Sequence, residues 1–283
     1  MSDNAESWDL IISSRRSLFR LGVKDLWRYR DLLFLFVRRD FVAFYKQTAL
    51  GPVWFFLQPL FTMLVYILVF GKMAGISTDG LPRPLFYLAG ITAWSYFSEC
   101  LIKTSTVFKD NAAMFGKIYF PRLVVPFSIV ISNLVRFGVQ VLLLLLFMLY
   151  YSLQGALVSV SWNLIWFPVM VILMAMQGLG LGMIVSALTT RYRDLALLLN
   201  FGVQLLMFST TVVYPLSSLS GKFYSIVSLN PLTHIMEGVR YSLFGAGTCT
   251  FSGMLYAFTA SVVLLLVGIF MFNRVEKNFV DTI

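Results

Sequence analysis

The segment Tyr214–Gly245, YPLSSLSGKFYSIVSLNPLTHIMEGVRYSLFG, lies between two long apolar runs, and neither half of it is long enough to cross a membrane. A lipid-crossing helix needs about 20 apolar residues for a hydrocarbon core of roughly 30 Å. Residues 216–229 and 231–244 would each reach only about 21 Å at roughly 1.5 Å per residue. Between the halves, Asn230 favours a helix cap and Pro231 fits a first helical turn. The segment therefore predicts two short helices that enter a membrane without crossing it.

Two glycines, Gly245 and Gly247, follow the second half and offer positive-φ exits from a helix. A helix–break–helix hairpin of this kind leaves backbone polar groups at membrane depth. Only surrounding protein or a water-filled cavity can satisfy those groups there. Because a cavity is typical of a transporter, the hairpin favours transport as the function.

The composition indicates a polytopic membrane protein. The 283 residues are 59% hydrophobic and 12% charged, whereas soluble domains carry about 25% charge. The opening MSDNAESWDL has no apolar core, so we expect no cleaved signal peptide and a cytoplasmic N-terminus. The single His and two Cys show no metal spacing, which predicts free thiols and no metal site.

Apolar runs divide the rest of the chain into six predicted spans. We expect a cytoplasmic tail over 1–23, an amphipathic interface helix over 24–50, a transmembrane domain over 51–272 that includes the hairpin 214–245, and a cytoplasmic tail over 273–283. The spans are 53–70, 85 to between 102 and 108, 123–151, 164–188, 195–213 and 254–272. In the fourth span, the run Gly178–Gly182 (GLGLG) predicts close helix approach.

The positions of Lys and Arg predict the orientation of the chain. With the N-terminus inside, the cytoplasmic segments hold seventeen of these residues and the external segments hold four, with Arg136 left inside a span. The hairpin then lies on the external side. The net charge of +9 is explained by membrane orientation, so we expect no nucleic-acid partner.

Four motifs, in order along the chain, resemble the permease subunit of type II ABC exporters (ABC-2 type). They are Phe120-Pro121-Arg122 followed by Pro126, RYRDL at 191–195, LNPLTHIMEGVRYSLFG at 229–245 and EKNFVDTI at 276–283. The last is similar to the tail of O-antigen and related polysaccharide exporters. The resemblance covers nearly the whole chain from Leu26 to Ile283.

The resemblance implies a homodimer with two copies of a separate ABC nucleotide-binding subunit. Such a complex exports an undecaprenyl-linked polysaccharide across the bacterial inner membrane. The chain contains no G-x-x-x-x-G-K-[ST] loop to cradle phosphates, so ATP and Mg are expected in the partner, with no cofactor or enzyme activity in this chain. A drug or small-lipid ABC exporter is the nearest alternative.

The basic loop 109–122 is the segment to which the resemblance assigns coupling to the ATPase. The apolar residues of this loop favour a role in docking a partner. The alternative is that the loop is basic only because it sets the membrane topology. The residues expected to carry coupling are Asn111, Met114, Phe115, Lys117 and Tyr119.

The interface helix has a basic face suited to phosphate. Arg38, Arg39 and Lys46 would lie at headgroup height and could receive the pyrophosphate of the lipid-linked glycan through charge-assisted hydrogen bonds. Simple attraction to anionic membrane lipid explains the same charges equally well. An ordinary surface helix is a further alternative.

Aromatic residues gather in the first two spans and suit a glycan path, because sugars pack their C–H faces on aromatic rings. Interfacial belts and ordinary packing are the alternative explanation. The candidate path residues are Trp54, Tyr66, Tyr87, Trp94 and Tyr96.

Glu99 and Arg136 are ionisable residues inside the second and third spans, where such groups are costly unless they pair or face water. If the inner boundary lies near residues 109 and 126, both sit at about 15 Å depth and could pair. If the second span ends at Ile102, the pairing fails.

The second half of the hairpin carries polar residues that we expect to line an external gate and to satisfy the broken backbone. They are Asn230, His234, Glu237 and Tyr241. An integral membrane glycosyl- or acyltransferase would instead use His234 and Glu237 as an acid–base pair. The absence of a second catalytic cluster argues against that alternative.

Overall fold

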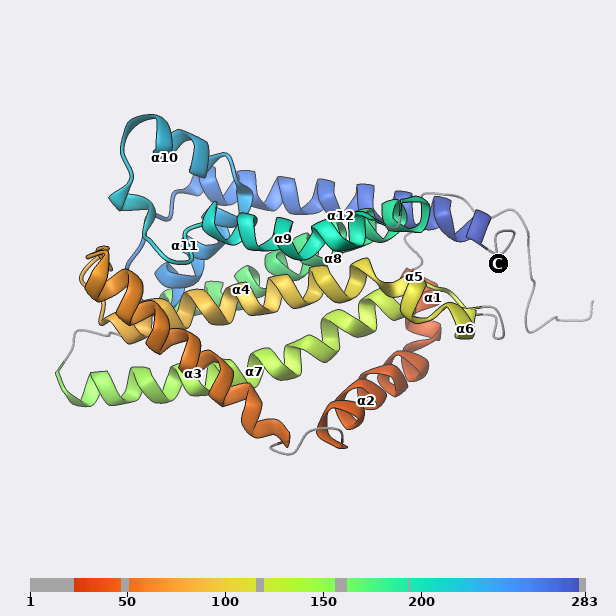
Figure 1. Cartoon of the computed structure of the whole chain (residues 1–283), viewed down its shortest axis with the longest axis horizontal. Coiled ribbons are helices and arrows are strands. Elements are labelled where there is room, and N and C mark those ends of the chain that lie inside the picture. The colour runs from red at the N-terminus through yellow and green to blue at the C-terminus, as the bar shows by residue number, and fades with distance from the viewer. Residues whose placement is uncertain (1–22, 47–50, 116–119, 156–161, 193, 280–283) are drawn as a thin grey trace, which may run out of the picture.

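The computed structural model describes residues 23–46, 51–115, 120–155, 162–192 and 194–279. Within these ranges the chain is helical and contains no strand, which confirms the predicted all-α class. Long helices run along one axis, with α5, α6 and the end of α12 at one end and α10 and α11 at the other (Figure 1). The helices are α1 (Val23–Arg28), α2 (Arg30–Lys46), α3 (Trp54–Tyr66), α4 (Arg83–Ser105), α5 (Val107–Asp110), α6 (Ala112–Phe115), α7 (Val124–Leu153), α8 (Phe167–Arg191), α9 (Leu195–Phe208), α10 (Gly221–Ser228), α11 (Pro231–Phe244) and α12 (Phe251–Phe279).

Five helical stretches of the described chain are long and apolar enough to cross a membrane. They are Trp54–Met73, Arg83–Ser105, Val124–Leu153, Trp162–Thr190 and Phe251–Glu276. The first continues α3 through a π-helical turn (η2, Ile67–Met73), and the fourth begins with a 3₁₀ turn (η3, Trp162–Trp166). The chain is therefore a multi-pass membrane protein.

The predicted fifth span is represented by α9, which has 14 residues and ends at Phe208. Its length is about 21 Å, less than a straight crossing needs. The backbone turns after Phe208, and the carbonyls of Thr211 and Val212 accept hydrogen bonds from Arg240 instead of continuing a helix. The count of six spans stays a prediction.

Glycines hold the centre of the bundle together by letting backbones touch. A Cβ added at Gly178 of α8 would lie 2.9 Å from the carbonyl oxygen of Phe97 on α4. On another face of α8, a Cβ on Gly268 of α12 would lie 2.5 Å from the carbonyl oxygen of Gly180. Real side chains do not tolerate such distances, so the helices can approach this closely only with glycine. The close approach predicted from GLGLG is confirmed.

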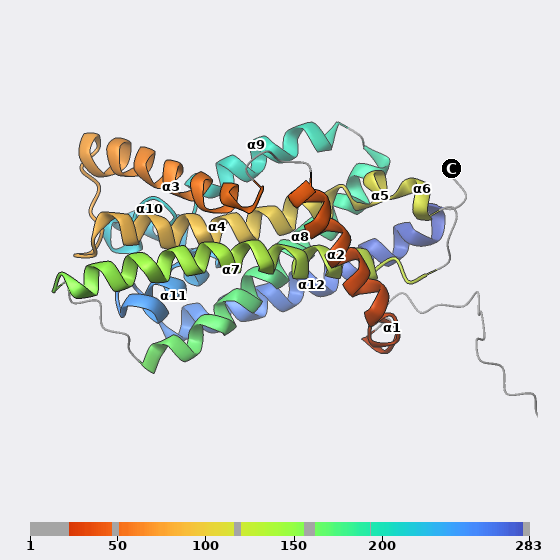
Figure 2. The ribbon, with the colours of Figure 1, turned by 90° about the horizontal axis from the view of Figure 1, so that it is seen from below.

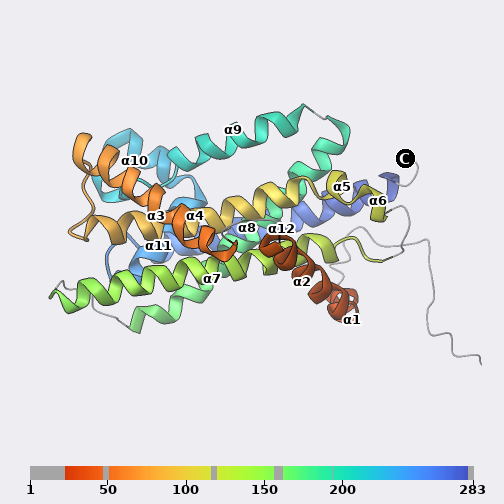
Figure 3. The same ribbon diagram turned by 60° about the horizontal axis from the view of Figure 1, so that its bottom comes forward.

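The predicted interface helix is divided into α1 and α2 at Tyr29, although neither glycine nor proline marks the break. Figures 2 and 3 show α2 crossing the bundle beside α7. Leu33 and Phe36 are buried, whereas Phe34 and Leu35 are exposed. This exposed apolar surface is compatible with lipid on the outer side of α2.

The segment after α9 contains a 3₁₀ turn (η4, Leu216–Ser218), then α10 and α11. The bounds of α11 agree with the predicted second half. The Asn230 side chain caps α11 by accepting from the Leu232 N–H at 3.1 Å, and Gly245 ends it at φ +68°. The first half is shorter than predicted, because α10 begins only at Gly221, where φ is +58°.

Candidate functional site

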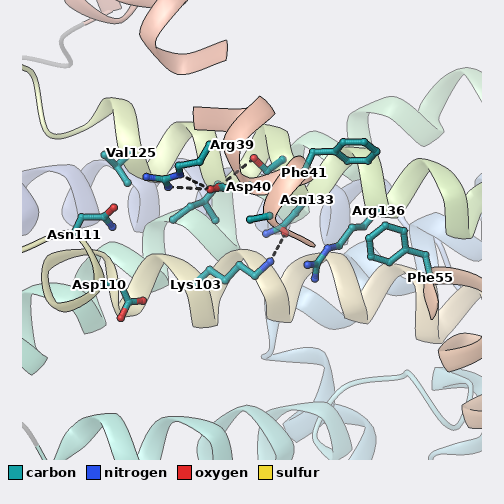
Figure 4. Close-up of a pocket in the computed structure, with 13 residues that line it drawn as sticks. Arg39, Asp40, Phe41, Phe55, Lys103, Asp110, Asn111, Val125, Asn133 and Arg136 are labelled. Carbon is teal, nitrogen blue, oxygen red and sulfur yellow. Dashed lines mark hydrogen bonds and ion pairs between the residues drawn. The ribbon is translucent and has the colours of Figure 1, made fainter. Parts of the chain in front are cut away.

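A pocket of about 480 Å³ lies between α2, α4 and α7 (Figure 4). Three cationic side chains line it, and each comes from a different helix: Arg39, Lys103 and Arg136. In Figure 4, Asp110 and Asn111 lie at one end of the pocket, Phe55 lies at the other beside Arg136, and Lys103 lies between. The pocket therefore combines cations with carboxylate and amide groups.

A second pocket of about 270 Å³ lies between α3, α4, α7 and α9. Phe55, Asn133 and Arg136 line both pockets, so the two adjoin at these residues. We refer to the pair of pockets as the α4 groove. Its second part is lined by aromatic rings and by uncharged polar side chains such as Gln58 and Gln140.

Glu99 bridges two cations where the two pockets meet. Its Oε2 atom lies 3.1 Å from Nη1 of Arg136 and 3.0 Å from Nζ of Lys103. Lys103 also donates to Oδ1 of Asn133 at 3.2 Å. The structure thus brings the predicted pair Glu99 and Arg136 together. It adds Lys103, which the i, i+4 spacing from Glu99 could have indicated.

The three basic residues predicted to receive phosphate are separated by the structure. Arg39 lines the pocket and is held there by Asp40, with Nη2 at 2.9 Å from Oδ1. The Oδ2 atom of Asp40 in turn accepts from the Ser132 hydroxyl at 3.5 Å. Arg38 and Lys46 are exposed and do not line the α4 groove.

Only some of the five aromatic residues predicted to form the glycan path line the α4 groove. Tyr66, Trp94 and Tyr96 line the second part of the α4 groove. Trp54 is 42% exposed at the start of α3, and it lines neither pocket. Tyr87 is fully buried and packs edge-on against Tyr66, with ring centroids 6.1 Å apart. Tyr87 is therefore an interior packing residue that supports Tyr66.

The predicted coupling loop forms α5 and α6, and Lys117 and Tyr119 lie outside the described residues. The Asn111 side chain donates to the Val107 carbonyl at 3.0 Å and also lines the first pocket. Met114 is partly buried, whereas Phe115 is buried. Phe115 therefore supports the loop from inside and offers little surface to a partner.

An aromatic cluster surrounds Phe115 at this end of the bundle. Phe115 lies 5.8 Å from Phe120 and 6.1 Å from Phe108, and Phe108 stacks on Phe272 of α12 at 4.5 Å. The Arg122 guanidinium lies 5.3 Å from the Phe115 ring and donates to the Glu276 carbonyl at 3.0 Å. Burial lowers the pKa of Arg122, and the nearby Glu276 carboxylate opposes that shift. The loop, α7 and α12 are thus packed as a unit.

Glu237, a predicted gate residue, is fully buried among the described residues. Its carboxylate accepts from the backbone N–H groups of Leu216 and Thr248 at 3.2 and 3.1 Å. It also pairs with Arg240 at 2.9 Å. These contacts satisfy the backbone on both sides of α11.

Arg240 was not among the predicted site residues. Its Nη2 donates to the carbonyls of Thr211 and Val212, and its Cζ lies 3.9 Å from the Phe86 ring centroid. A Cβ at Gly90 of α4 would lie 2.6 Å from the Val212 carbonyl oxygen, so the turn after α9 rests directly on α4. The three-residue spacing of Glu237 and Arg240 on one helix was the available sequence signal.

The remaining hairpin residues make local contacts. His234 Nε2 lies 2.9 Å from the Ser228 carbonyl oxygen, and Asn230 Nδ2 donates to the Ser209 carbonyl at 3.4 Å. Tyr241 is partly buried. Because His234 and Glu237 have different partners, the geometry does not assemble the acid–base pair of a transferase. Across the described residues, no group of three or more His, Cys, Asp or Glu could hold a metal ion.

The fold and the α4 groove together define a helical multi-pass membrane protein with a partly ionic, partly aromatic groove along a central helix. The chain belongs to the ABC-2 type transporter family, whose profile matches residues 31–244. It is 28% identical over 264 residues to the O-antigen export system permease protein RfbA of Myxococcus xanthus, covering 92% of this chain and 98% of that protein. It is 26% identical to RfbA of Klebsiella pneumoniae, covering 89% and 94%. It is also 22% identical to the polysialic acid transport protein KpsM of Escherichia coli, covering 87% and 93%.

Proposed function

We propose that this chain is the transmembrane subunit of an ATP-driven exporter that moves a lipid-linked polysaccharide across the bacterial inner membrane. The observation that carries the proposal is the α4 groove, in which an ionic pocket adjoins an aromatic one at Phe55, Asn133 and Arg136. A lipid-linked glycan needs both chemistries, because its phosphate groups bind cations and its sugars pack on rings. The family membership and the export functions named for the relatives support the same substrate class.

The proposed topology has six spans, with α9 and the turn after it crossing as the fifth. The N-terminus, the α5–α6 loop and the C-terminus face the cytoplasm, and α10 and α11 form a re-entrant hairpin on the external side. The distribution of seventeen Lys and Arg against four supports this orientation. This topology keeps the predicted division of the chain into a tail over 1–23, an interface segment over 24–50, a transmembrane domain over 51–272 and a tail over 273–283.

The proposed assembly is a homodimer that binds two ABC nucleotide-binding subunits, which hold ATP and Mg. Large apolar side chains are exposed on α3 and α9, the helices that border the aromatic pocket, and they suit contact with a second copy or with lipid. Coupling to the ATPase takes place at the α5–α6 loop. There the exposed Lys109 and Asp110 and the partly buried Met114 are available to a partner.

The decisive experiment reconstitutes the chain in proteoliposomes together with an ABC ATPase subunit from the same organism. Lipid-linked glycan is expected to stimulate ATP hydrolysis and to appear on the opposite side of the membrane. Replacing Tyr66 with Ala should lower transport while assembly persists, because Tyr66 lines the groove. The matched control is Trp162→Ala, since Trp162 is 94% exposed and outside the groove. Equal stimulation by small amphiphiles, or failure to assemble with an ATPase, would rule out the proposed function.

A further inference from the structure

The carboxylate of Glu99 occupies a place between two cations that an outside anion could take. Lys103 and Arg136 come from different helices and both lie within 3.1 Å of the same oxygen atom of Glu99. Both cations line the first pocket. Glu99 itself lines the second pocket, so the contact is at the junction of the two.

The rest of the described chain does not enclose these three side chains. The exposed fractions are 42% for Glu99, 39% for Lys103 and 26% for Arg136. Because these ion pairs border the two pockets, the anionic group of a ligand in the α4 groove could reach both cations. The buried pair Glu237–Arg240 is the opposite case, because its side chains are 0% and 2% exposed and a missing partner there could not be replaced by solvent.

A third cation, Arg39 of α2, also pairs with a carboxylate in this pocket. Arg39 pairs with Asp40 at 2.9 Å, with exposed fractions of 50% and 32%. Each of the three cations therefore contacts a carboxylate of the same chain, and Lys103 and Arg136 share that of Glu99. That arrangement keeps the groove stable when it contains no ligand and leaves cations ready for one.

We propose that Lys103 and Arg136 form a diphosphate-binding site in the α4 groove, and that Glu99 is the internal anion that a ligand's diphosphate displaces. The proposal rests on the proposed function, with an undecaprenyl-linked glycan that carries a diphosphate between its lipid and its first sugar as the substrate. A guanidinium and an ammonium together suit this group, since Arg offers a planar fork of donors and Lys a compact charge. The displaced carboxylate of Glu99 stays in the α4 groove, where Glu99 lines the second pocket.

The position of the site fits the chemistry on either side of the diphosphate. The Arg136 guanidinium lies 5.1 Å from the Phe55 ring, at the beginning of the aromatic pocket. A diphosphate bound by Arg136 and Lys103 places the adjoining sugar at this aromatic wall. Arg38 and Lys46, on the exposed side of α2, then contribute only a general attraction to anionic lipid.

The test measures binding of farnesyl diphosphate to the purified full-length chain in detergent by calorimetry, with farnesol and inorganic pyrophosphate as comparison probes. Farnesyl diphosphate should bind and farnesol should not. Lys103→Gln and Arg136→Gln should each weaken binding by about tenfold, the effect of losing one charge-assisted contact. Glu99→Gln should strengthen binding several-fold, because it removes the competing anion. Arg38→Gln and Lys46→Gln are matched controls and should leave binding unchanged.

Misfolding cannot imitate the gain in affinity expected for Glu99→Gln, so this variant keeps the test decisive if the others prove unstable. Inorganic pyrophosphate should compete with farnesyl diphosphate, and failure to compete would show that the prenyl chain carries binding and overturn the site. Loss of binding in Arg38→Gln or Lys46→Gln with normal binding in Lys103→Gln would also overturn it. If either result overturns the diphosphate site but the chain still transports lipid-linked glycan, the proposed function remains supported. If the wild-type chain binds no diphosphate and transports no glycan, both fail.

Discussion

Arg240 donates a 2.9 Å hydrogen bond to Glu237 three residues earlier on α11, and both side chains are almost completely buried. The same guanidinium also holds the carbonyls of Thr211 and Val212. The pair therefore connects α11 to the turn that ends α9. It supplies the polar contacts that the backbone of this turn cannot make within a helix.

Replacing Arg240 with Met should destabilise the chain by about 3–5 kcal/mol, because it leaves Glu237 buried without its countercharge. The measurement is the thermal unfolding midpoint of the purified protein in detergent. Lys222→Met is the control, since Lys222 is exposed on α10. Equal midpoints for the two variants would show that the buried pair does not support the fold.

A second prediction concerns the contact between α8 and α12. Gly180→Ala should destabilise the bundle by about 1–3 kcal/mol through overpacking, since the added Cβ would lie 2.7 Å from the Leu264 backbone. Gly138→Ala in α7 is the matched control, because no atom lies within 4 Å of a Cβ there. The control should be neutral or slightly stabilising. Similar unfolding of both variants would contradict the backbone contact.

The two cysteines test the proposed orientation. Cys249 is partly exposed in the connection between α11 and α12, whereas Cys100 is buried. A membrane-impermeant maleimide should therefore label intact cells at Cys249, and Cys249→Ser should abolish labelling. In that background, Lys109→Cys on α5 should react only after the membrane is permeabilised. Labelling of Lys109→Cys in intact cells would reverse the orientation.

The pH dependence of this labelling follows from the surroundings of Cys249. Burial raises the pKa of its thiol, and the Glu237 carboxylate raises it further. A raised pKa means less thiolate at neutral pH, and the thiolate is the reactive form. Labelling should therefore be slower than that of an exposed cysteine near pH 7.5 and should continue to accelerate at higher pH. A rate that is already maximal at neutral pH would contradict this description.

The coupling loop yields separate predictions for two neighbouring residues. Met114→Glu should lower substrate-stimulated ATP hydrolysis without changing the unfolding midpoint, because Met114 is only partly buried. Phe115→Ala should instead destabilise the chain by about 3–5 kcal/mol, the cost of a cavity in an aromatic cluster. Normal ATPase stimulation in Met114→Glu would argue against coupling through this loop.

Local chemistry made parts of the fold predictable from the sequence. The start of α11 could be located because Asn230 and Pro231 act on their own helix turn, and Gly245 ends it in the same way. The GLGLG contacts were predictable for a similar reason, since only glycine permits such approach. The length of α9 was not predictable from the sequence. The turn that ends α9 is held by Arg240, which lies about thirty residues further along the chain.

The candidate site was predictable only where charge spacing could be read along the chain. Glu99 and Arg136 stood out as ionisable groups in apolar runs, and the structure brings them together. Lys103 was missed as their partner because it was counted only toward membrane orientation. Tyr87 was assigned to the glycan path because the sequence does not distinguish an aromatic residue that lines a groove from one that packs behind it. Only the folded structure shows that Tyr66 lines the groove and that Tyr87 is buried behind it.

The glycine contacts that bind α8 to both α4 and α12 have a mechanical consequence. Backbones that touch through Gly178, Gly180 and Gly268 cannot slide past one another without steric clash. These three helices must therefore move as a single rigid body during a transport cycle. Widening of the groove then has to come mainly from α3, which borders it without such a contact, because the turn that ends α9 rests on Gly90 of α4.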